Sequence, residues 1–327
     1  MSSTALKQAV ASVANPPTPL AGSRPAWRRA LGRVDHVVSP YLFVSPFFAL
    51  FLVFGLFPIL YTAYVSLHDW NIIGTHEWVG WQNYATLWAD PRFWNALGNT
   101  VSIWALSTFP QLALALMLAH VLNERVLRGK TFFRMSLLVP NVTSVVAVAI
   151  IFESIFGLHY GLANFVTEAL GFDRINWQAG TLTSHIAIAT MVTWRWMGYN
   201  ALIYLAALQS VPRDLYEASA IDGAGRRQQF RHVTIPMLRP TIIFTLIVST
   251  IGGLQIFAEP LLFATAPGVS GGSARQFQTL TLFLYEQSFR SFKFGYASAI
   301  AWVLFLVIVV AALVNYRFVR RIRSAED

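Results

Sequence analysis

The chain has 327 residues, of which 55% are hydrophobic and only 12% are charged, and its formal net charge is +9 at pH 7. Soluble globular proteins carry about 25% charged residues, so the composition excludes an ordinary soluble protein and favours an all-α integral membrane protein. The absence of cysteine excludes disulfides, thiolate catalysis, zinc–thiolate sites and iron–sulfur clusters.

The first 36 residues are rich in Ala, Ser and Pro and predict a disordered tail. The apolar run that follows is too long for the core of a cleavable signal peptide, so we expect it to be retained. A spanning helix needs roughly 20 mostly apolar residues, and six stretches meet this length: 41–67, 96–122, 135–156, 183–208, 240–263 and 294–316. The sequence thus predicts one six-helix transmembrane domain over residues 37–320 and a short tail over 321–327.

Basic residues predict the orientation of these helices. Of the 24 Lys and Arg residues, 18 fall in the N-terminal tail, the loops after the second and fourth predicted helices, and the C-terminal tail. The positive-inside rule then places both termini in the cytoplasm of a multi-pass protein in the bacterial plasma membrane, in contact with lipid. Topology accounts for the positive charge, so nucleic acid is not an expected partner.

Short matches to catalytic motifs lack the sequence context that those motifs require. Gly129-Lys130-Thr131 resembles the end of a phosphate-binding loop, but Glu124 stands where that pattern requires glycine. Ser270 has the spacing of a nucleophile elbow in a segment that reads as a flexible loop, not a strand-to-helix turn. The seven histidines lack metal-ligand spacing. We therefore expect no catalytic residue, no metal site and no bound cofactor, and the chain is not predicted to be an enzyme.

The loop between the fourth and fifth predicted helices, residues 209–239, has internal order. Ser210 is a candidate helix cap, and Pro212 and Asp214 suit a first helical turn. Leu215, Ala218 and Ile221 recur every three residues, which predicts an apolar stripe on a short helix.

The second half of this loop predicts a turn and another short helix. Gly223 and Gly225 permit a sharp stop. A helix over 226–235 would carry Phe230 and Val233 on one face until Pro236 breaks it. The loop thus reads as a docking element at the cytoplasmic surface, and the alternative is an interfacial helix lying on lipid.

The spacing of this loop resembles a known signature. Glu217-Ala218-Ser219, three residues, Gly223, nine residues and Val233-Thr234-Ile235-Pro236 are similar to the EAA motif of ABC-importer permeases, with conservative departures at Ser219, Val233 and Ile235. Asp222-Gly223-Ala224 further resembles the carbohydrate branch of that family. The similarity covers roughly residues 38–320, and the segment from Gly80 to Tyr84 resembles the first permease subunit of maltose- and glycerol-3-phosphate-type importers.

This resemblance implies a type I ABC-importer permease fold with defined partners. These are a second permease, two copies of an ABC ATPase that binds ATP and Mg²⁺, and an extracytoplasmic sugar-binding protein that delivers a sugar. The loop would form the coupling helix that docks on the ATPase. The residues that the resemblance assigns to this contact are Glu217, Ala218, Ser219, Asp222, Gly223, Leu215, Phe230 and Pro236.

The two predicted helices that flank the loop carry polar and aromatic groups suited to a sugar, and the resemblance places substrate contacts there. The candidates are Trp196, Tyr199, Asn200, Ser249, Gly252, Gly253, Gln255 and Arg195. Packing within the bundle is the alternative role for each of them. Arg195 stands near the middle of a predicted span, where a charge is costly, so we expect it to face the pore or the second permease.

Three other functions remain open. A stand-alone secondary transporter would usually show internal repeats and carboxylates at mid-membrane, whereas the acids of the predicted spans, Glu153 and Glu259, are near span ends. An ABC permease for a non-sugar solute shares the same loop. A membrane enzyme would require a polar catalytic cluster, which the sequence does not offer.

Overall fold

The computed structural model describes residues 26–71, 74, 76–123, 129–263 and 270–323, and the chain divides into two units, Met1–Tyr61 and Thr62–Asp327. In the first unit, α2 (Ala26–Phe51) leads through a π-helical turn, η1 (Leu52–Leu56), into α3 (Phe57–Ser66), which continues past the boundary. Residues 26–36 of the predicted tail are therefore helical, because Ala, Leu and Arg in this stretch favour helix. Residues 1–25 lie outside the described part.

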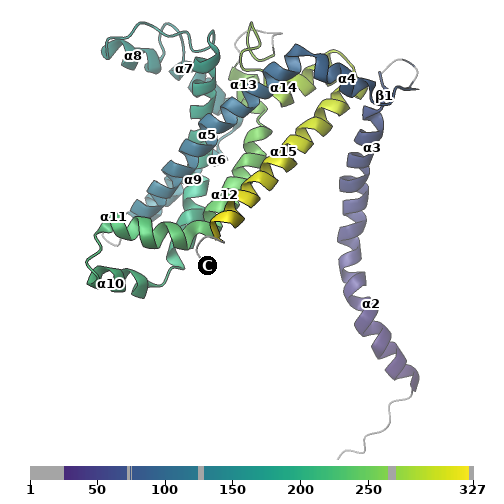
Figure 1. Ribbon diagram of the computed structural model, residues 1–327, viewed down its shortest axis with the longest axis horizontal. Coiled ribbons are helices and arrows are strands. Elements are labelled where there is room, and N and C mark those ends of the chain that lie inside the picture. The colour runs from purple at the N-terminus through teal and green to yellow at the C-terminus, as the bar shows by residue number, and fades with distance from the viewer. Residues whose placement is uncertain (1–25, 72–73, 75, 124–128, 264–269, 324–327) are drawn as a thin grey trace, which may run out of the picture. The chain divides into compact units, whose positions relative to one another are not determined.

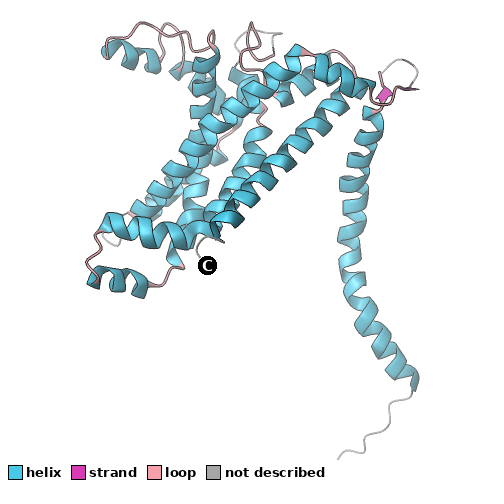
Figure 2. Ribbon diagram, viewed as in Figure 1, coloured by secondary structure: helices cyan, strands magenta, loops and turns pink. Residues whose placement is uncertain are grey.

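The described residues of the second unit form helices, the loops that join them and one small hairpin (Figures 1 and 2). Strands β1 (His68–Asp69) and β2 (Glu77–Trp78) pair antiparallel. The helices before the loop are α4 (Gln82–Ala89), α5 (Pro91–Asn123), α6 (Lys130–Val142), α7 (Val145–Ile155), α8 (Leu162–Ala169) and α9 (Thr181–Gln209). The rest of the unit holds α10 (Arg213–Ile221), α11 (Arg226–Gln229), the π-helical turn η2 (Phe230–Thr234), α12 (Ile235–Leu254), α13 (Ala258–Phe263), α14 (Leu280–Tyr285), the π-helical turn η3 (Glu286–Arg290) and α15 (Phe294–Arg323).

Helix α5 lies at the centre of this unit. It contributes to three buried apolar clusters, with Phe93 packing near α14 and α15, Ile103 near α7, α9 and α13, and Ala115 near α9 and α12. Figure 1 shows α10 and α11 at one end of the bundle of this unit and α4, α13 and α14 at the other. The loop and the α13 region are thus at opposite ends of the same helices.

The six-helix prediction exceeds what length and composition support in the described part of the chain. Four helices are long and apolar enough to cross a membrane: Ser39–Ser66, Pro91–Asn123, Arg226–Leu254 and Phe294–Arg317. The predicted fourth span corresponds to α9, which has 29 residues but carries polar groups such as His185, Arg195 and Asn200. Much of α9 is buried against α5 and other helices, so its side chains need not be as apolar as those facing lipid.

The third predicted span is broken. Helices α6 and α7 are bent by 95° at a short break between Val142 and Val145, and they count as a fifth span only if they are taken together. Thr143 ends α6 in an extended conformation, and its hydroxyl donates to the Val139 carbonyl at 2.6 Å. Ser144, the N-cap of α7, is also non-helical, with a ψ of 134°, so two successive residues outside the helical conformation turn the chain between α6 and α7.

Candidate functional site

The 209–239 loop begins with a helix that starts later than predicted. Ser210 does not cap α10, because its hydroxyl donates back to the Ala207 carbonyl at 2.7 Å and it ends α9. Pro212 occupies the N-cap position of α10, and Asp214 lies in the first turn. A carboxylate there interacts favourably with the positive end of the helix dipole.

The turn after α10 has the geometry that its glycine predicts. Gly223 has a φ of 83°, in the left-handed region. The Gly223 amide donates to the Ala220 carbonyl at 3.1 Å, and the Ala224 amide donates to the Ser219 carbonyl at 2.9 Å. These two bonds form a Schellman motif. A side chain at position 223 would strain this turn, so Gly223 sets the direction in which the chain leaves α10.

The apolar stripe predicted on α10 has no partner within the described part of the chain. Ile221 is 87% exposed and Leu215 is 41% exposed, and α10 contains no buried residue. Glu217 is also exposed, and its carboxylate makes no hydrogen bond or ion pair with the described residues. The helix therefore presents two apolar side chains and an unpaired acid to the outside.

Hydrogen bonds that the sequence did not predict tie α10 to the next helix. The side-chain amide of Gln229 donates to the Tyr216 carbonyl at 3.0 Å and to the Ser219 hydroxyl at 3.1 Å. The Tyr216 hydroxyl lies 3.0 Å from that of Thr234, which is buried in η2. Side-chain bonds across the turn make the loop a braced unit rather than a flexible connector.

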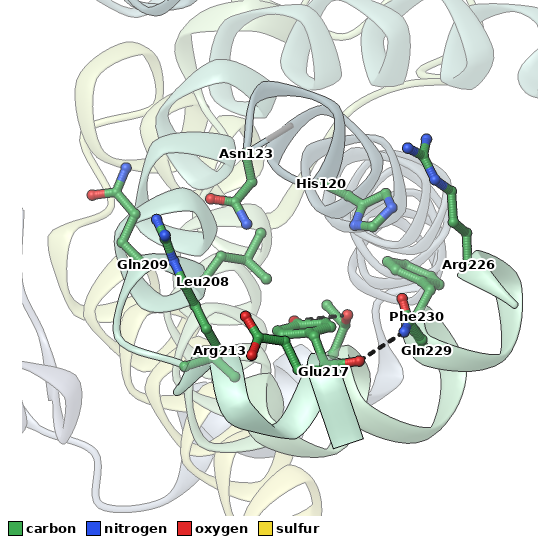
Figure 3. Close-up of a pocket in the computed structure, with 12 residues that line it drawn as sticks. His120, Asn123, Leu208, Gln209, Arg213, Glu217, Arg226, Gln229 and Phe230 are labelled. Carbon is green, nitrogen blue, oxygen red and sulfur yellow. Dashed lines mark hydrogen bonds between the residues drawn. The ribbon is translucent and has the colours of Figure 1, made fainter. Parts of the chain in front are cut away.

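A polar cavity of about 500 Å³ lies between this braced unit and the ends of α5 and α9. Figure 3 shows the ring of Phe230 beside His120, and Glu217 and Arg213 at the α10 side of the cavity. The Phe230 and His120 rings are 4.8 Å apart in an edge-to-face arrangement. Phe230, which the resemblance assigns to the contact with another subunit, makes this internal contact with α5.

Pro236 does not end the second helix of the loop, contrary to the prediction. Helices α11 and α12 join through η2 into one span of 29 residues, Arg226–Leu254. Pro236 stands two residues after the π-helical turn, at the second position of α12. The wider turn changes the hydrogen-bond register just before the proline, which lacks an amide proton. The second half of the loop, from Arg226 onward, and the far end of α12 thus belong to one continuous helix.

The substrate-pathway residues predicted from sequence meet around a second cavity. This cavity, of about 400 Å³, is lined by α5, α9, α12 and the start of α13, and we call it the α5–α9–α12 cavity. Seven of the eight predicted residues line it: Trp196, Tyr199, Asn200, Ser249, Gly252, Gly253 and Gln255. Thr108 and Gln111 of α5 and Glu259 of α13 complete its polar lining, and none of the three is among the predicted residues.

Aromatic and glycine residues shape this cavity in different ways. Trp196 and Tyr199 are partly exposed, with ring centroids 6.1 Å apart and nearly perpendicular planes. Trp194 instead packs against Phe152 of α7. A Cβ on Gly252 would meet no atom within 4 Å, whereas one on Gly253 would lie 2.7 Å from Trp104. Gly252 therefore keeps the cavity open, and Gly253 permits close packing of α12 on α5.

Arg195 is the predicted residue that does not line the cavity. Its guanidinium forms a short ion pair with Glu259 of α13, and both side chains are largely buried. Glu259, which the sequence places near the end of the fifth predicted span, is itself a lining residue. Helix α12 ends at Leu254 and the chain turns back at Gln255–Phe257. This break places Glu259 beside α9.

A helical bundle with this loop and cavity can be compared with known families. Residues 100–324 match the profile of the family described as binding-protein-dependent transport system inner membrane component. The chain belongs to this family. As a member, it is a membrane permease component with no indicated catalytic activity. The resemblance that the EAA-like loop carried is thereby confirmed.

Curated relatives match this permease over nearly their full length. It is 39% identical to the lactose transport system permease protein LacF of Rhizobium radiobacter over 282 residues, covering 85% of this chain and 93% of that protein. It is 35% identical to the arabinooligosaccharides transport system permease protein AraP of Bacillus subtilis over 304 residues, covering 92% and 94%.

A solved structure shares the fold. A chain of the bacterial alginate ABC transporter, crystallised in complex with an alginate pentasaccharide-bound periplasmic protein, superposes with a TM-score of 0.76. Sequence identity is 22%, and the match covers 90% of this chain and 98% of that one. The permease therefore has the fold of an ABC-importer membrane subunit.

Proposed function

We propose that this permease is a subunit of an ATP-driven sugar importer in the bacterial cytoplasmic membrane. It forms half of the translocation pathway and pairs with a second permease, two copies of an ABC ATPase and an extracytoplasmic sugar-binding protein. The names of LacF and AraP support a saccharide as the solute. The periplasmic protein in the alginate transporter complex supports a binding protein among the partners. ATP and Mg²⁺ bind to the ATPase, not to this chain.

One observation carries the proposal: the continuous helix from Arg226 to Leu254. It is about 40 Å long at about 1.5 Å per residue. One end is braced to α10, and the other carries Gly252 and Gly253 at the α5–α9–α12 cavity. A movement imposed on α10 therefore reaches the cavity as a tilt of one rigid element, which is a standard form of conformational coupling.

Within this proposal α10 is the surface that meets the ATPase. Leu215 and Ile221 supply exposed apolar area, and Glu217 supplies an unpaired carboxylate for a cation on the partner. Burial of exposed apolar side chains is the main driving force for such contacts, and the charge adds specificity. Ser219 and Asp222 flank the Schellman turn that orients this surface.

Within the same proposal α9 crosses the membrane as a sixth span, and both termini are cytoplasmic. The basic residues of the loop support this orientation. The α5–α9–α12 cavity then serves as this subunit's part of the sugar pathway. Trp196 and Tyr199 offer aromatic faces, and Asn200, Ser249 and Gln255 offer hydrogen-bonding groups.

Reconstitution tests this function. The permease is co-expressed with its second permease and ATPase, placed in proteoliposomes, and supplied with the binding protein and labelled saccharides. We expect uptake that requires ATP hydrolysis and all four components. Uptake driven by an ion gradient in liposomes that lack the ATPase would instead identify a secondary transporter.

A further inference from the structure

The α5–α9–α12 cavity has one charged lining residue. Glu259 is the single carboxylate among the described residues that line it, and no Lys, Arg or His is present there. The remaining polar groups are neutral hydroxyls and amides, such as Thr108, Gln111 and Asn200. A solute in this cavity would therefore encounter neutral hydrogen-bonding groups and one acid.

The acid has one engaged oxygen and one available oxygen. Oε1 of Glu259 accepts a hydrogen bond from Nη1 of Arg195, and Oε2 makes no hydrogen bond with the described residues. Arg195 lies behind the acid and is not itself a lining residue. Pairing with Arg195 makes burial of the carboxylate tolerable, and because Arg195 is not a lining residue, the cavity gains a negatively charged acceptor without gaining a free cation.

The backbone that carries Glu259 is held in place from the neighbouring loop. The Thr279 hydroxyl donates to the Ile256 carbonyl at 3.1 Å, and the Thr281 hydroxyl donates to the same carbonyl. Thr279 is buried and caps α14 through its own side chain. The turn between α12 and α13 is thus fixed on one side by α14 and on the other by the ion pair, so the acceptor is preorganised.

We infer that Glu259 accepts hydrogen bonds from the hydroxyls of a neutral saccharide, that Arg195 is its positioning residue, and that the pair makes the cavity select against anionic sugars. This inference rests on the proposed function and narrows its substrate class. A sugar carboxylate or sulfonate near Oε2 would meet a like charge, with no unpaired cation in the described lining to offset it. Repulsion of this kind is an effective device for specificity.

Direct binding to the complete permease–ATPase complex tests the inference without the binding protein, whose own specificity would otherwise dominate. Neutral disaccharides are screened first. The one that binds is then compared with an analogue that carries one carboxylate, by equilibrium binding of the radiolabelled sugars. We expect the acidic analogue to bind the wild-type complex at least about tenfold more weakly.

Two variants locate the selectivity. Glu259→Gln should bring the two affinities closer, mainly by improving binding of the acidic analogue. Because it leaves Arg195 with a buried unpaired charge, the double variant Arg195→Gln/Glu259→Gln is measured beside it, and there the preference should fall to about twofold or less. Glu153→Gln, an exposed acid of α7 outside this cavity, is the matched control and should leave the ratio unchanged.

The outcomes separate this inference from the proposed function. Equal wild-type affinity for neutral and acidic sugars, or an unchanged ratio in the double variant, would overturn the selectivity of the Arg195–Glu259 pair while leaving the importer in place. Failure of every complex to bind or import any saccharide would overturn the proposed function itself.

Discussion

The side-chain amide of Gln229 donates a hydrogen bond to the backbone carbonyl of Tyr216 at 3.0 Å, and so ties α11 to α10 across the loop. The same amide donates to the Ser219 hydroxyl at 3.1 Å. Because both bonds come from one side chain, the second requires little further loss of side-chain entropy, and each bond stabilises the folded state by about 1 kcal/mol. These bonds hold α10 against α11, which is continuous with α12, so α10 and α12 move together as one rigid element.

Removing the Gln229 hydrogen bonds should weaken the coupling between movement of α10 and movement of α12. Gln229→Ala loses both bonds, so we expect several-fold lower ATP-driven uptake with little loss of assembled complex, because α10 itself stays exposed and intact. Uptake rate and subunit stoichiometry are measured in the same preparation. Arg231→Ala, an exposed residue on the next turn, is the control. Equal losses in both variants would argue against a role for the Gln229 brace.

Glu217 should matter for partner contact but not for folding. Its carboxylate is exposed and has no partner in the described part of the chain. Glu217→Ala should therefore change the free energy of unfolding of the isolated permease by less than about 0.5 kcal/mol. Affinity for the ATPase should fall several-fold in a detergent binding assay. An unchanged affinity would exclude Glu217 from the interface.

The two adjacent glycines should respond differently to alanine. Gly253→Ala brings a methyl group within 2.7 Å of Trp104 and should destabilise the bundle by about 1–3 kcal/mol. Gly252→Ala meets no neighbouring atom, so the fold should be retained while the added methyl narrows the cavity and slows uptake. Thermal unfolding in detergent and uptake by proteoliposomes distinguish the two effects. The reverse pattern would contradict the assigned roles.

Much of the cavity could be predicted because the resemblance to ABC-importer permeases places substrate contacts on the two helices that flank the loop, and the helical spacing of the candidates agrees with it. Trp196, Tyr199 and Asn200 are three and four residues apart, so a helix places them on one face. Ser249 and Gly252 have the same relationship on α12. Polar residues on one face of an apolar helix indicate that this face meets water or a ligand, and in the structure these residues line the same cavity.

Contacts that depend on a chain reversal could not be predicted. Glu259 meets Arg195 only because α12 stops at Leu254 and α13 starts a new direction. The Gln229–Tyr216 bond forms because the Gly223 turn, with its φ of 83°, brings α11 back beside α10. Pro236 predicted a helix end, but the preceding π-helical turn accommodates it. In each case the deciding geometry is set by neighbouring elements that local sequence does not encode.

The free energy of unfolding should depend on pH through Asp90, the residue that precedes α5. Burial alone would raise the pKa of Asp90, but hydrogen bonds from Arg92 and from Tyr296 outweigh burial and hold the pKa below its usual 3.8. A carboxyl with a lowered pKa in the folded state stabilises the fold at higher pH. That contribution is complete above about pH 5 and is lost as the pH falls through the lowered pKa.

Melting temperatures of the wild type and Asp90→Asn check this sign. The wild type should melt at a higher temperature than the variant between about pH 5 and pH 8, and the difference should shrink as the pH falls below about 4. A difference that instead grows under acid conditions would contradict the assignment of a lowered pKa to Asp90.

Site-directed cross-linking tests docking of the loop on an ATPase most directly, and the chain suits it because it contains no cysteine. A single cysteine is placed at Ile221, the most exposed large hydrophobic residue of α10, or at Tyr160, which is fully exposed between α7 and α8. Each variant is treated with a short thiol-to-amine cross-linker in membranes that contain the assembled transporter. The account predicts a cross-link from Ile221→Cys to the ATPase and none from Tyr160→Cys. An Ile221→Cys permease that assembles and reacts with the reagent, yet never cross-links to the ATPase, would contradict it.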